Sequence, residues 1–162
     1  MEELKVKNII IGKQFEESEN YQNFIEIVNK NKIKVYVVEA GQKINIEKNL
    51  YFDVLWPDSK NVVEKNSINN NSLVVKLIYN NFSILFTGDI EEIAEKSILK
   101  KYEKNKSILD SDILKVAHHG SKSSSTEEFL NVVKPKIALI GVGKNNNFGH
   151  PNNEVLERLR RI

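Results

Sequence analysis

The chain has no cysteine and no long hydrophobic run. Without cysteine it forms no disulfide, and thiolate metal sites and cysteine nucleophiles are excluded. A transmembrane helix needs about 20 mostly apolar residues, and no stretch of the chain approaches this length. The charged start, Met1 to Lys7, lacks the apolar core of a signal peptide. The chain as written is therefore expected to be soluble, and nothing in it selects a compartment.

Several motifs of common enzyme and binding classes are also missing. Gly141-x-Gly143 lacks the third glycine of a dinucleotide-binding fingerprint, and there is no Gly-rich phosphate loop. No Gly-x-Ser-x-Gly nucleophile elbow is present. The 24 basic and 22 acidic residues are intermixed and give a net charge of +2, so bulk charge does not indicate a nucleic-acid partner. No basic stretch is interleaved with aromatic residues, as single-strand-binding segments often are.

The length of 162 residues fits one domain or most of one, and the apolar content of 40% is enough for a packed core. We find no internal repeat and no linker. The hydrophobic pattern is rich in strands at first and then alternates strand and helix, which predicts an α/β sandwich.

The pattern also places the individual elements. Strands are predicted at 6–11, 33–38, 44–46, 51–56, 72–79, 82–86, 113–117 and 137–142. The run 82–86 is apolar almost throughout, which predicts a strand buried on both faces. Helices are predicted to begin after Ser18, at 91–102, after a capping box of Ser125 with Glu128, and from Pro151 to the end. The polar, Asn-rich residues 58–71 are predicted to be a loop.

Two motifs at predicted strand ends carry the chemistry. Thr87-Gly88-Asp89 follows one strand, and His118-His119-Gly120-Ser121 follows the next. The three histidines of the chain, His118, His119 and His150, all lie in its last third. Carboxylates and imidazoles are ligands that suit zinc or manganese. Strand ends of an α/β fold are also where such folds present their sites.

Each of these residues has a second interpretation. Asp89 can be a metal ligand, or it can be the N-cap of the following helix with Glu92 at the third helical position. Neighbouring residues in extended backbone point to opposite faces, so one histidine of the pair can face a site. We favour His118 as the ligand because it continues the strand 113–117, with His119 as the alternative.

The hydroxyl-rich stretch 121–126 either makes turn and cap contacts or binds phosphate through Ser121, Lys122 and Ser123. His150 lies in the loop after the last predicted strand. It is either a helix-entry residue without a chemical role or a ligand, ligand-supporting or proton-donating histidine.

The same motifs resemble a known family. They are Thr87-Gly88-Asp89, the run from Leu114 to Ser121 and Gly149-His150-Pro151, together with Asn70-Asn71-Ser72 and the run from Pro135 to Ile140. Their order and spacing are similar to the metallo-β-lactamase-fold domain of ComEC-type competence proteins. The likeness covers roughly residue 34 onward, and Thr-Gly-Asp together with His-His-Gly-Ser is fairly specific.

The resemblance implies a metallo-β-lactamase-like αββα sandwich with two divalent metal ions, zinc or manganese, at one edge. It implies Asp89 as a bridging carboxylate, one histidine of the pair as a ligand, and His150 in the same site, with His119 or His150 donating a proton to the leaving group. In the family this domain is tied to DNA uptake and is thought to be a nuclease. The implied partners are DNA or another phosphodiester and a membrane channel domain of the same parent protein, which would place this domain outside the cytoplasm.

The chain departs from the family pattern in one large respect. The first metal motif, His-x-His-x-Asp-His, is absent, because no histidine precedes His118, and the closing strands after the final helix are absent too. We therefore expect residues 1–162 to be a single, partial domain, incomplete at both ends, whose partner is the missing N-terminal half. Alone it should bind metal weakly, hydrolyse slowly and associate through an exposed sheet face. The alternatives are a hydrolase of a small phosphoester or lactone and a degenerate, non-catalytic binding or structural domain.

Overall fold

The computed structural model describes residues 5–13 and 18–162 and confirms the predicted α/β class. Residues 1–4, part of the charged start considered above, and residues 14–17 lie outside the described residues. The strands are β1 (Asn8–Gly12), β2 (Lys34–Val38), β3 (Lys43–Glu47), β4 (Leu50–Trp56), β5 (Val74–Tyr79), β6 (Phe82–Phe86), β7 (Ile113–Lys115) and β8 (Ile137–Leu139). The α-helices are α1 (Glu19–Lys30), α2 (Ser67–Asn70), α3 (Glu92–Lys101), α4 (Glu127–Val133) and α5 (Asn153–Arg160).

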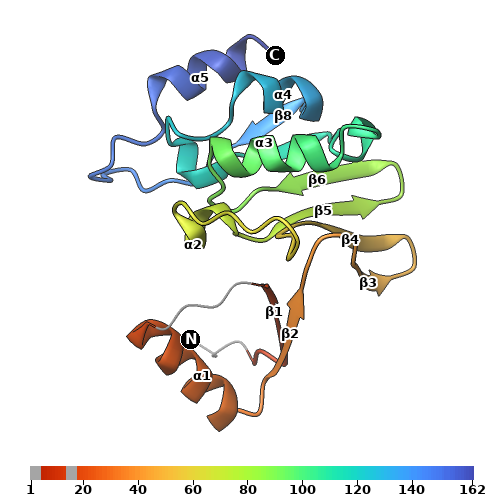
Figure 1. The fold of residues 1–162 in the computed structure, drawn as a ribbon, viewed down its shortest axis with the longest axis vertical. Coiled ribbons are helices and arrows are strands. Elements are labelled where there is room, and N and C mark those ends of the chain that lie inside the picture. The colour runs from red at the N-terminus through yellow and green to blue at the C-terminus, as the bar shows by residue number, and fades with distance from the viewer. Residues whose placement is uncertain (1–4, 14–17) are drawn as a thin grey trace.

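Six strands form the main sheet, in the order β3-β4-β5-β6-β7-β8 (Figure 1). Neighbours from β3 to β6 are antiparallel, and β5 and β6 form the predicted hairpin with Tyr79 opposite Phe82. β6, β7 and β8 run parallel to one another. Parallel neighbours end at the same sheet edge, so the loops after β6, β7 and β8 meet there.

One face of this sheet is covered by helices and holds the core. Leu85 of β6 and Leu114 of β7 are paired in the register and are almost fully buried. They belong to one cluster with Ile98 of α3 and Phe129 of α4. Trp56, at the end of β4, is also fully buried, and its indole N–H donates to the carbonyl of Asn70 at 2.7 Å. Apolar residues recur at every second position in the strands and about every 3.6 positions in the helices. The apolar sides of strands and helices that result face each other in this layer.

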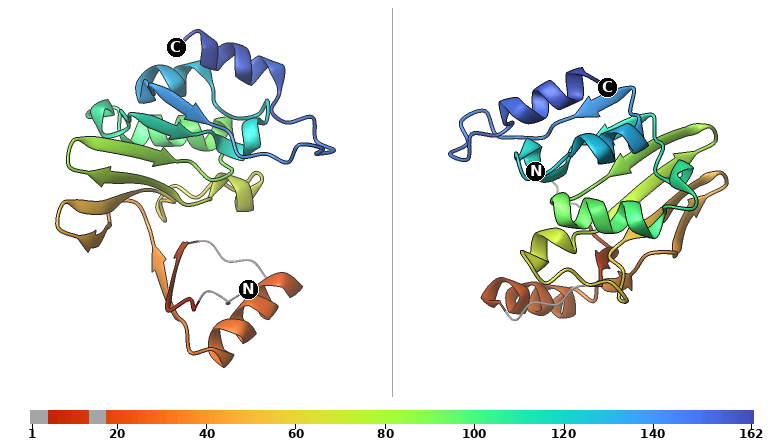
Figure 2. Two further views of the ribbon diagram at one scale, coloured as in Figure 1. Left: turned by 180° about the vertical axis from the view of Figure 1, so that it is seen from behind. Right: turned by 45° about the horizontal axis from the view of Figure 1, so that its top comes forward.

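The opposite face of the sheet is apolar but uncovered. Side chains alternate between faces, so the partners of the core residues point away from the helices. One row crosses all six strands through consecutive register pairs: Ile44, Phe52, Leu77, Ile84, Ile113 and Ile137. Figure 2 (left) shows this side with no helix in front of it, and Ile137 is 52% exposed. The prediction that 82–86 is buried on both faces is therefore wrong in this structure, where only Leu85 of β6 is buried.

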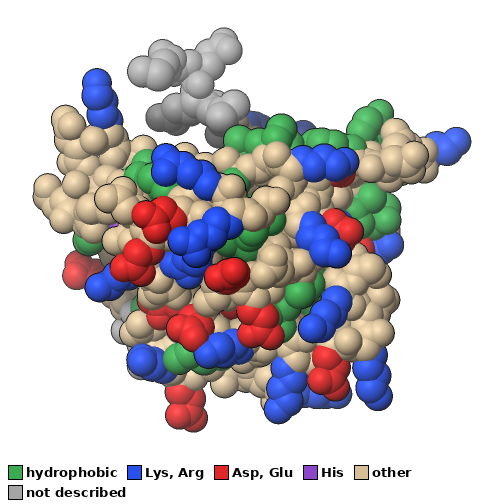
Figure 3. Space-filling model, turned by 90° about the horizontal axis from the view of Figure 1, so that it is seen from above, with side chains coloured by type: hydrophobic (Ala, Val, Ile, Leu, Met, Phe, Trp, Pro, Cys, Tyr) green, Lys and Arg blue, Asp and Glu red, His purple; other side chains and the backbone are tan. Residues whose placement is uncertain are grey.

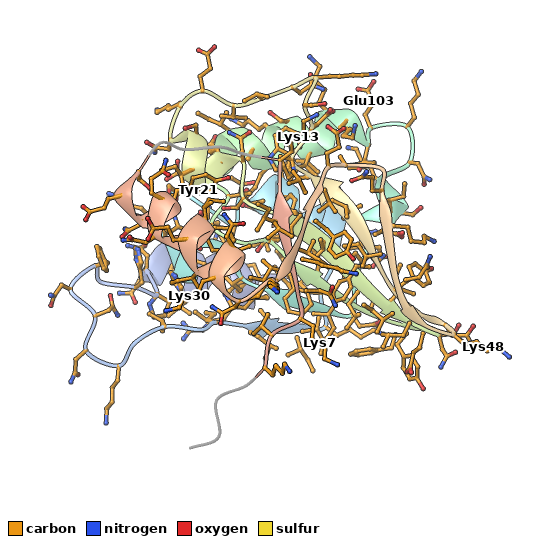
Figure 4. The ribbon with its side chains drawn as sticks, turned by 90° about the horizontal axis from the view of Figure 1, so that it is seen from below. Lys7, Lys13, Tyr21, Lys30, Lys48 and Glu103 are labelled. Atoms are coloured by element: carbon orange, nitrogen blue, oxygen red, sulfur yellow. The ribbon has the colours of Figure 1, made fainter. Side chains whose placement is uncertain are left out.

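The N-terminal residues form a smaller unit below the main sheet. β1 and β2 pair in parallel, and α1 connects them. The predicted cap of α1 is confirmed, because the Ser18 hydroxyl accepts from the Tyr21 amide at 3.2 Å. A largely apolar cavity of about 670 Å³ lies between this unit and the segment 59–71. Figure 4, seen from below, labels two of its lining residues, Lys13 and Tyr21.

The structure settles the starts of three predicted helices. α3 begins at Glu92, one residue from the predicted 91, and its cap is Glu91, so the interpretation of Asp89 as the cap is wrong, because the chain stays non-helical for two residues after Asp89. The cap of α4 is Thr126, whose hydroxyl accepts from the Phe129 amide, whereas Ser125 has a positive φ of 56°. α5 is capped by Asn152. The predicted start at Pro151 is therefore early, because the Asn152 side chain accepts from the amide of Glu154, the second residue of the helix.

The predicted loop 58–71 contains the single-turn helix α2, which the Asn-rich sequence did not indicate. In the part of the chain that the structure describes, no helix combines the length and the apolar character that crossing a bilayer requires. Figure 3 shows that basic and acidic side chains are interspersed on the face seen from above. This agrees with the mixed charge pattern of the sequence.

Candidate functional site

The predicted site residues lie at the edge where β6, β7 and β8 end (Figure 1). The loop after β6 carries Asp89, the loop after β7 carries His118 and His119, and the loop after β8 leads to His150. Backbone hydrogen bonds join these loops, since the amide of His118 donates to the carbonyl of Gly88 at 3.0 Å. The structure thus brings together residues that are 61 positions apart in sequence, from Asp89 to His150.

Two glycines allow this close approach. Gly88 has φ +54°, and a Cβ there would lie 2.7 Å from the Cβ of Ser72. Gly120 has φ +82°, and a Cβ there would lie 2.8 Å from the Cβ of Pro151. Gly120 therefore lets the His-His-Gly-Ser turn pack directly on the Gly-His-Pro segment.

The local backbone of the histidine pair differs from the prediction. β7 ends at Lys115, and His118 and His119 lie in a short turn with φ of 47° and 55°. Neither residue continues the strand, so the expectation that they point to opposite sheet faces is wrong. Two consecutive non-glycine residues with positive φ are uncommon and are held here by the surrounding contacts.

His119 faces Asp89. Its Nε2 lies 3.9 Å from Oδ1 of Asp89, and the two side chains are 52% and 45% exposed. The other ring nitrogen, Nδ1, lies 2.6 Å from the carbonyl oxygen of Gly141. Because a carbonyl only accepts, Nδ1 carries the proton, and a neutral ring then presents the Nε2 lone pair toward the carboxylate. A backbone carbonyl that fixes the tautomer in this way is typical of metal-binding histidines.

His118 faces a different carboxylate. Its Nδ1 lies 3.8 Å from Oε1 of Glu91, and its ring is in edge-to-face contact with that of His150, with 5.9 Å between centroids. The Nδ1 atoms of His118 and His150 are buried and have no hydrogen-bond partner among the described residues. Buried polar atoms are usually paired, so two such nitrogens in contacting rings indicate a place for a proton, a water or a ligand.

Glu91 is a site residue that the sequence pattern marks only as the start of the predicted helix 91–102. Its carboxylate accepts from Asn66 at 2.9 Å, from Asn70 at 3.1 Å and from the Ser123 hydroxyl at 3.1 Å. Burial alone would raise the pKa of Glu91, but these hydrogen bonds outweigh it and lower the pKa. Glu91 is therefore a fixed anion beside His118. No local signal marks it, since its partners come from distant segments.

The three residues predicted to bind phosphate have different environments. Ser121 and Ser123 share a hydroxyl contact of 3.0 Å, and Ser121 is buried. Lys122 is exposed, and its carbonyl accepts from Arg158 at 3.2 Å. The amides at the start of α4 already have an acceptor, because the buried carboxyl group of Glu95 accepts from Ser125 and Thr126. Lys122 is thus the member of the predicted set that is open to a phosphate.

The donor set has the right chemistry for zinc or manganese but is small. Ligand bonds of about 2.1 Å place two donors of one ion at most about 4.2 Å apart, so Asp89 and His119, at 3.9 Å, can hold one ion between them. Over residues 5–13 and 18–162, however, no group of three or more His, Cys, Asp or Glu side chains is arranged to hold a metal ion. A catalytic zinc usually has three protein ligands. The described residues therefore fit part of a metal site.

Comparisons with known proteins agree with the resemblance seen in the sequence. ComE operon protein 3 of Bacillus subtilis is 35% identical over 157 residues, which are 97% of this chain and 19% of that protein. Competence protein ComA of Neisseria gonorrhoeae is 34% identical over 109 residues, which are 67% of this chain and 15% of that protein. The chain thus spans less than a fifth of the length of these relatives.

No family model matches the chain. Among solved structures, the metallo-β-lactamase fold protein YhfI from Bacillus subtilis aligns with 99% of this chain and 61% of its own, with 8% identity and a TM-score of 0.47. A similarity of this size carries no argument about function. The sequence relationships do identify the chain, which belongs to the family of ComEC-type competence proteins.

Proposed function

We propose that this chain contributes one side of a metal-dependent phosphodiesterase site that acts on DNA in competence. The observation that carries the proposal is the pair Asp89 and His119, with the His119 tautomer fixed by Gly141. A carboxylate oxygen and an imidazole lone pair that face each other at 3.9 Å can both bind a cation placed between them. A divalent ion at this position would satisfy both.

The neighbouring residues suit a phosphodiester substrate. A divalent ion held there would act as a Lewis acid on a phosphate oxygen. Lys122 is exposed in the turn that follows the histidine pair and can attract the phosphate. His118 and His150 have buried ring nitrogens without a hydrogen-bond partner among the described residues that can accept or donate a proton, and the carboxylate of Glu91 lies 3.8 Å from Nδ1 of His118.

The number of metal ligands determines how fast this site is expected to hydrolyse a phosphodiester. Two protein donors bind a divalent ion less tightly than three or four, and they fix its geometry less well. We therefore expect the 162-residue chain to bind metal weakly and to hydrolyse phosphodiesters slowly. Rapid, chelator-sensitive hydrolysis of DNA by this chain alone would contradict that expectation.

Binding of a labelled single-stranded 12-nucleotide DNA, measured by fluorescence anisotropy with and without Mn²⁺, tests the proposal. We expect Mn²⁺ to strengthen binding to the wild-type chain and to have no effect on Asp89→Asn. Asp53→Asn is the matched control, because Asp53 is a similarly exposed carboxylate that contacts Lys43 on the sheet, away from the site. Absence of any Mn²⁺ effect on the wild-type chain would contradict the proposal.

One alternative has an observation in its favour. A site with only two metal ligands, Asp89 and His119, also fits a domain that binds DNA without catalysis. Its Asp89 would then have no metal to hold, and Mn²⁺ would not change DNA binding. Since Asp89 does not cap α3, Asp89→Ala should leave the free energy of unfolding within about 0.5 kcal/mol under either hypothesis. A lost Mn²⁺ effect in an Asp89 variant can therefore be assigned to the metal and not to a loss of stability, while the Mn²⁺ effect on the wild-type chain separates the two functions.

A further inference from the structure

Phe148 is the most exposed of the large apolar residues that the structure describes as exposed. Its side chain is 81% exposed, although phenylalanine is usually buried. It lies in the loop that follows β8 and leads to His150. The Phe148 and His150 rings are stacked, with 5.9 Å between centroids and 22° between planes. One face of the phenyl ring therefore lies over the site and the other is open to solvent.

The side chain of Asn146 braces the loop that presents this ring. The Asn146 side chain accepts from the amides of Phe148 at 3.1 Å and His150 at 3.0 Å. Its NH₂ group donates to the carbonyls of Gly143 at 3.0 Å and His150 at 2.6 Å. A single side chain thus makes four hydrogen bonds that span the loop. A ring held in place before a ligand arrives loses little conformational freedom on binding.

The surroundings of Phe148 favour a nucleobase over an apolar protein surface. Lys144, Asn145 and Asn147 beside it in the loop are exposed and polar. Protein-docking patches are contiguous and cover several hundred Å² of apolar surface, whereas here one ring is set among amides and a cation. Aromatic rings beside basic and polar groups are the usual platform on which unpaired bases stack.

We propose that Phe148 is a stacking platform for an unpaired base of the DNA whose phosphodiester lies at the Asp89 and His119 site. This inference rests on the proposed function and adds that the preferred substrate is single-stranded. Phe148 stacks on His150, and His150 contacts His118 edge to face, so a base on the open face of Phe148 would have its own phosphate on the side of the histidines. In a duplex the same base is paired and stacked within the helix and is not available to the ring.

The test compares three fluorescein-labelled 12-mers in the presence of Mn²⁺. They are oligodeoxythymidylate, its duplex with oligodeoxyadenylate, and a single strand of abasic nucleotides with the same phosphates. We expect Phe148→Ala to weaken oligodeoxythymidylate binding by about 5- to 100-fold and abasic-strand binding by less than about twofold. Phe82→Ala is the control, because Phe82 is another exposed phenylalanine, 42% exposed and at the hairpin of the sheet.

A second variant reports stacking directly. Trp56, the one native tryptophan, is fully buried, so the fluorescence of Phe148→Trp is the signal of an exposed indole above a constant background. We expect oligodeoxythymidylate to quench this emission and the abasic strand to leave it unchanged. Quenching by both strands, or by neither although both bind, would overturn the proposal.

The outcomes also separate this inference from the proposed function. If the wild-type chain binds the thymidylate and abasic strands equally well, the site binds phosphodiesters and the stacking role is wrong. If it binds neither strand, the proposed function fails and the stacking role fails with it. If Phe148→Ala weakens binding of the thymidylate and abasic strands equally, the substitution has disturbed the site and has not removed a base contact. Loss of self-association in that variant, with DNA binding unchanged, would instead assign the ring to a protein interface.

Discussion

The ion pair between Asp58 and Lys101 allows a quantitative prediction. Nζ of Lys101 lies 2.8 Å from Oδ2 of Asp58, whose side chain is only 9% exposed. Burial would raise the pKa of Asp58. Hydrogen bonds from Lys101, Asn61 and the amide of Lys60 outweigh burial and lower the pKa from 3.8 to about 2. Asp58 begins the segment that carries Asn70, a partner of Glu91, so the pair also supports the site.

The size of the effect follows from the shift. A pKa lowered from 3.8 to about 2 corresponds to about 2 kcal/mol of stabilisation in the ionised state. Because the folded-state pKa lies below the unfolded one, this stability is fully present above about pH 4 and is lost as the pH falls toward 2. Asp58→Asn should therefore reduce the free energy of unfolding at pH 7 by about 2 kcal/mol, or the melting temperature by about 4–8 °C.

Urea denaturation of wild type and Asp58→Asn between pH 7 and pH 2 measures this difference. Lys101→Met, alone and combined with Asp58→Asn, separates the pair energy from the other contacts of Asp58. Asp53→Asn is the control, since the Lys43–Asp53 pair is longer, at 3.5 Å, and more exposed, and we expect a change within about 0.5 kcal/mol. Equal effects of the two aspartate substitutions at pH 7, or a difference that does not shrink in acid, would show that the Asp58–Lys101 pair does not stabilise the fold in this way.

Three further predictions concern α4 and the open sheet face. Thr126→Ala should reduce the free energy of unfolding by about 1 kcal/mol and Ser125→Ala by less, because Thr126 provides the cap of α4. Chemical denaturation compares the two variants. A larger loss in Ser125→Ala would contradict the assignment of Thr126 as the cap. Glu95→Ala should reduce the free energy of unfolding by about 3 kcal/mol, because it leaves the donors of Ser125 and Thr126 without their buried acceptor. A loss below about 1 kcal/mol in the same denaturation assay would contradict the role of Glu95 as that acceptor. Ile137→Lys should reduce self-association through the open face of the sheet, as measured by sedimentation velocity. A wild-type chain that stays monomeric at high concentration would show that this face does not associate.

The regular elements could be predicted because their signals are local. The β5–β6 hairpin is recorded in two apolar runs separated by Asn80-Asn81, and α1 in the cap at Ser18 and an apolar stripe. The errors at Asp89, Ser125 and Pro151 are shifts of one or two residues. At each position two neighbouring polar side chains can cap, and tertiary contacts decide between them.

The site itself was predictable in composition but not in geometry. The motifs indicated that Asp89 and the histidines meet, because strand ends converge on one edge of a sheet. The left-handed backbone of His118 and His119 depends on contacts with Gly88 and Gly141, which come from other loops. Glu91 is recognisable only once α2 and the Ser123 turn are placed around it.

Asp89 and His119 are proposed to bind a divalent ion together, and pulsed electron paramagnetic resonance of Mn²⁺ detects such binding at the level of single ligands. In wild-type chain saturated with Mn²⁺, we predict modulation of the Mn²⁺ echo by an imidazole nitrogen. This signal should persist in His118→Gln and disappear in His119→Gln, and Asp89→Asn should abolish most of the binding. A nitrogen signal that survives in His119→Gln, or that is lost in His118→Gln instead, would contradict the account.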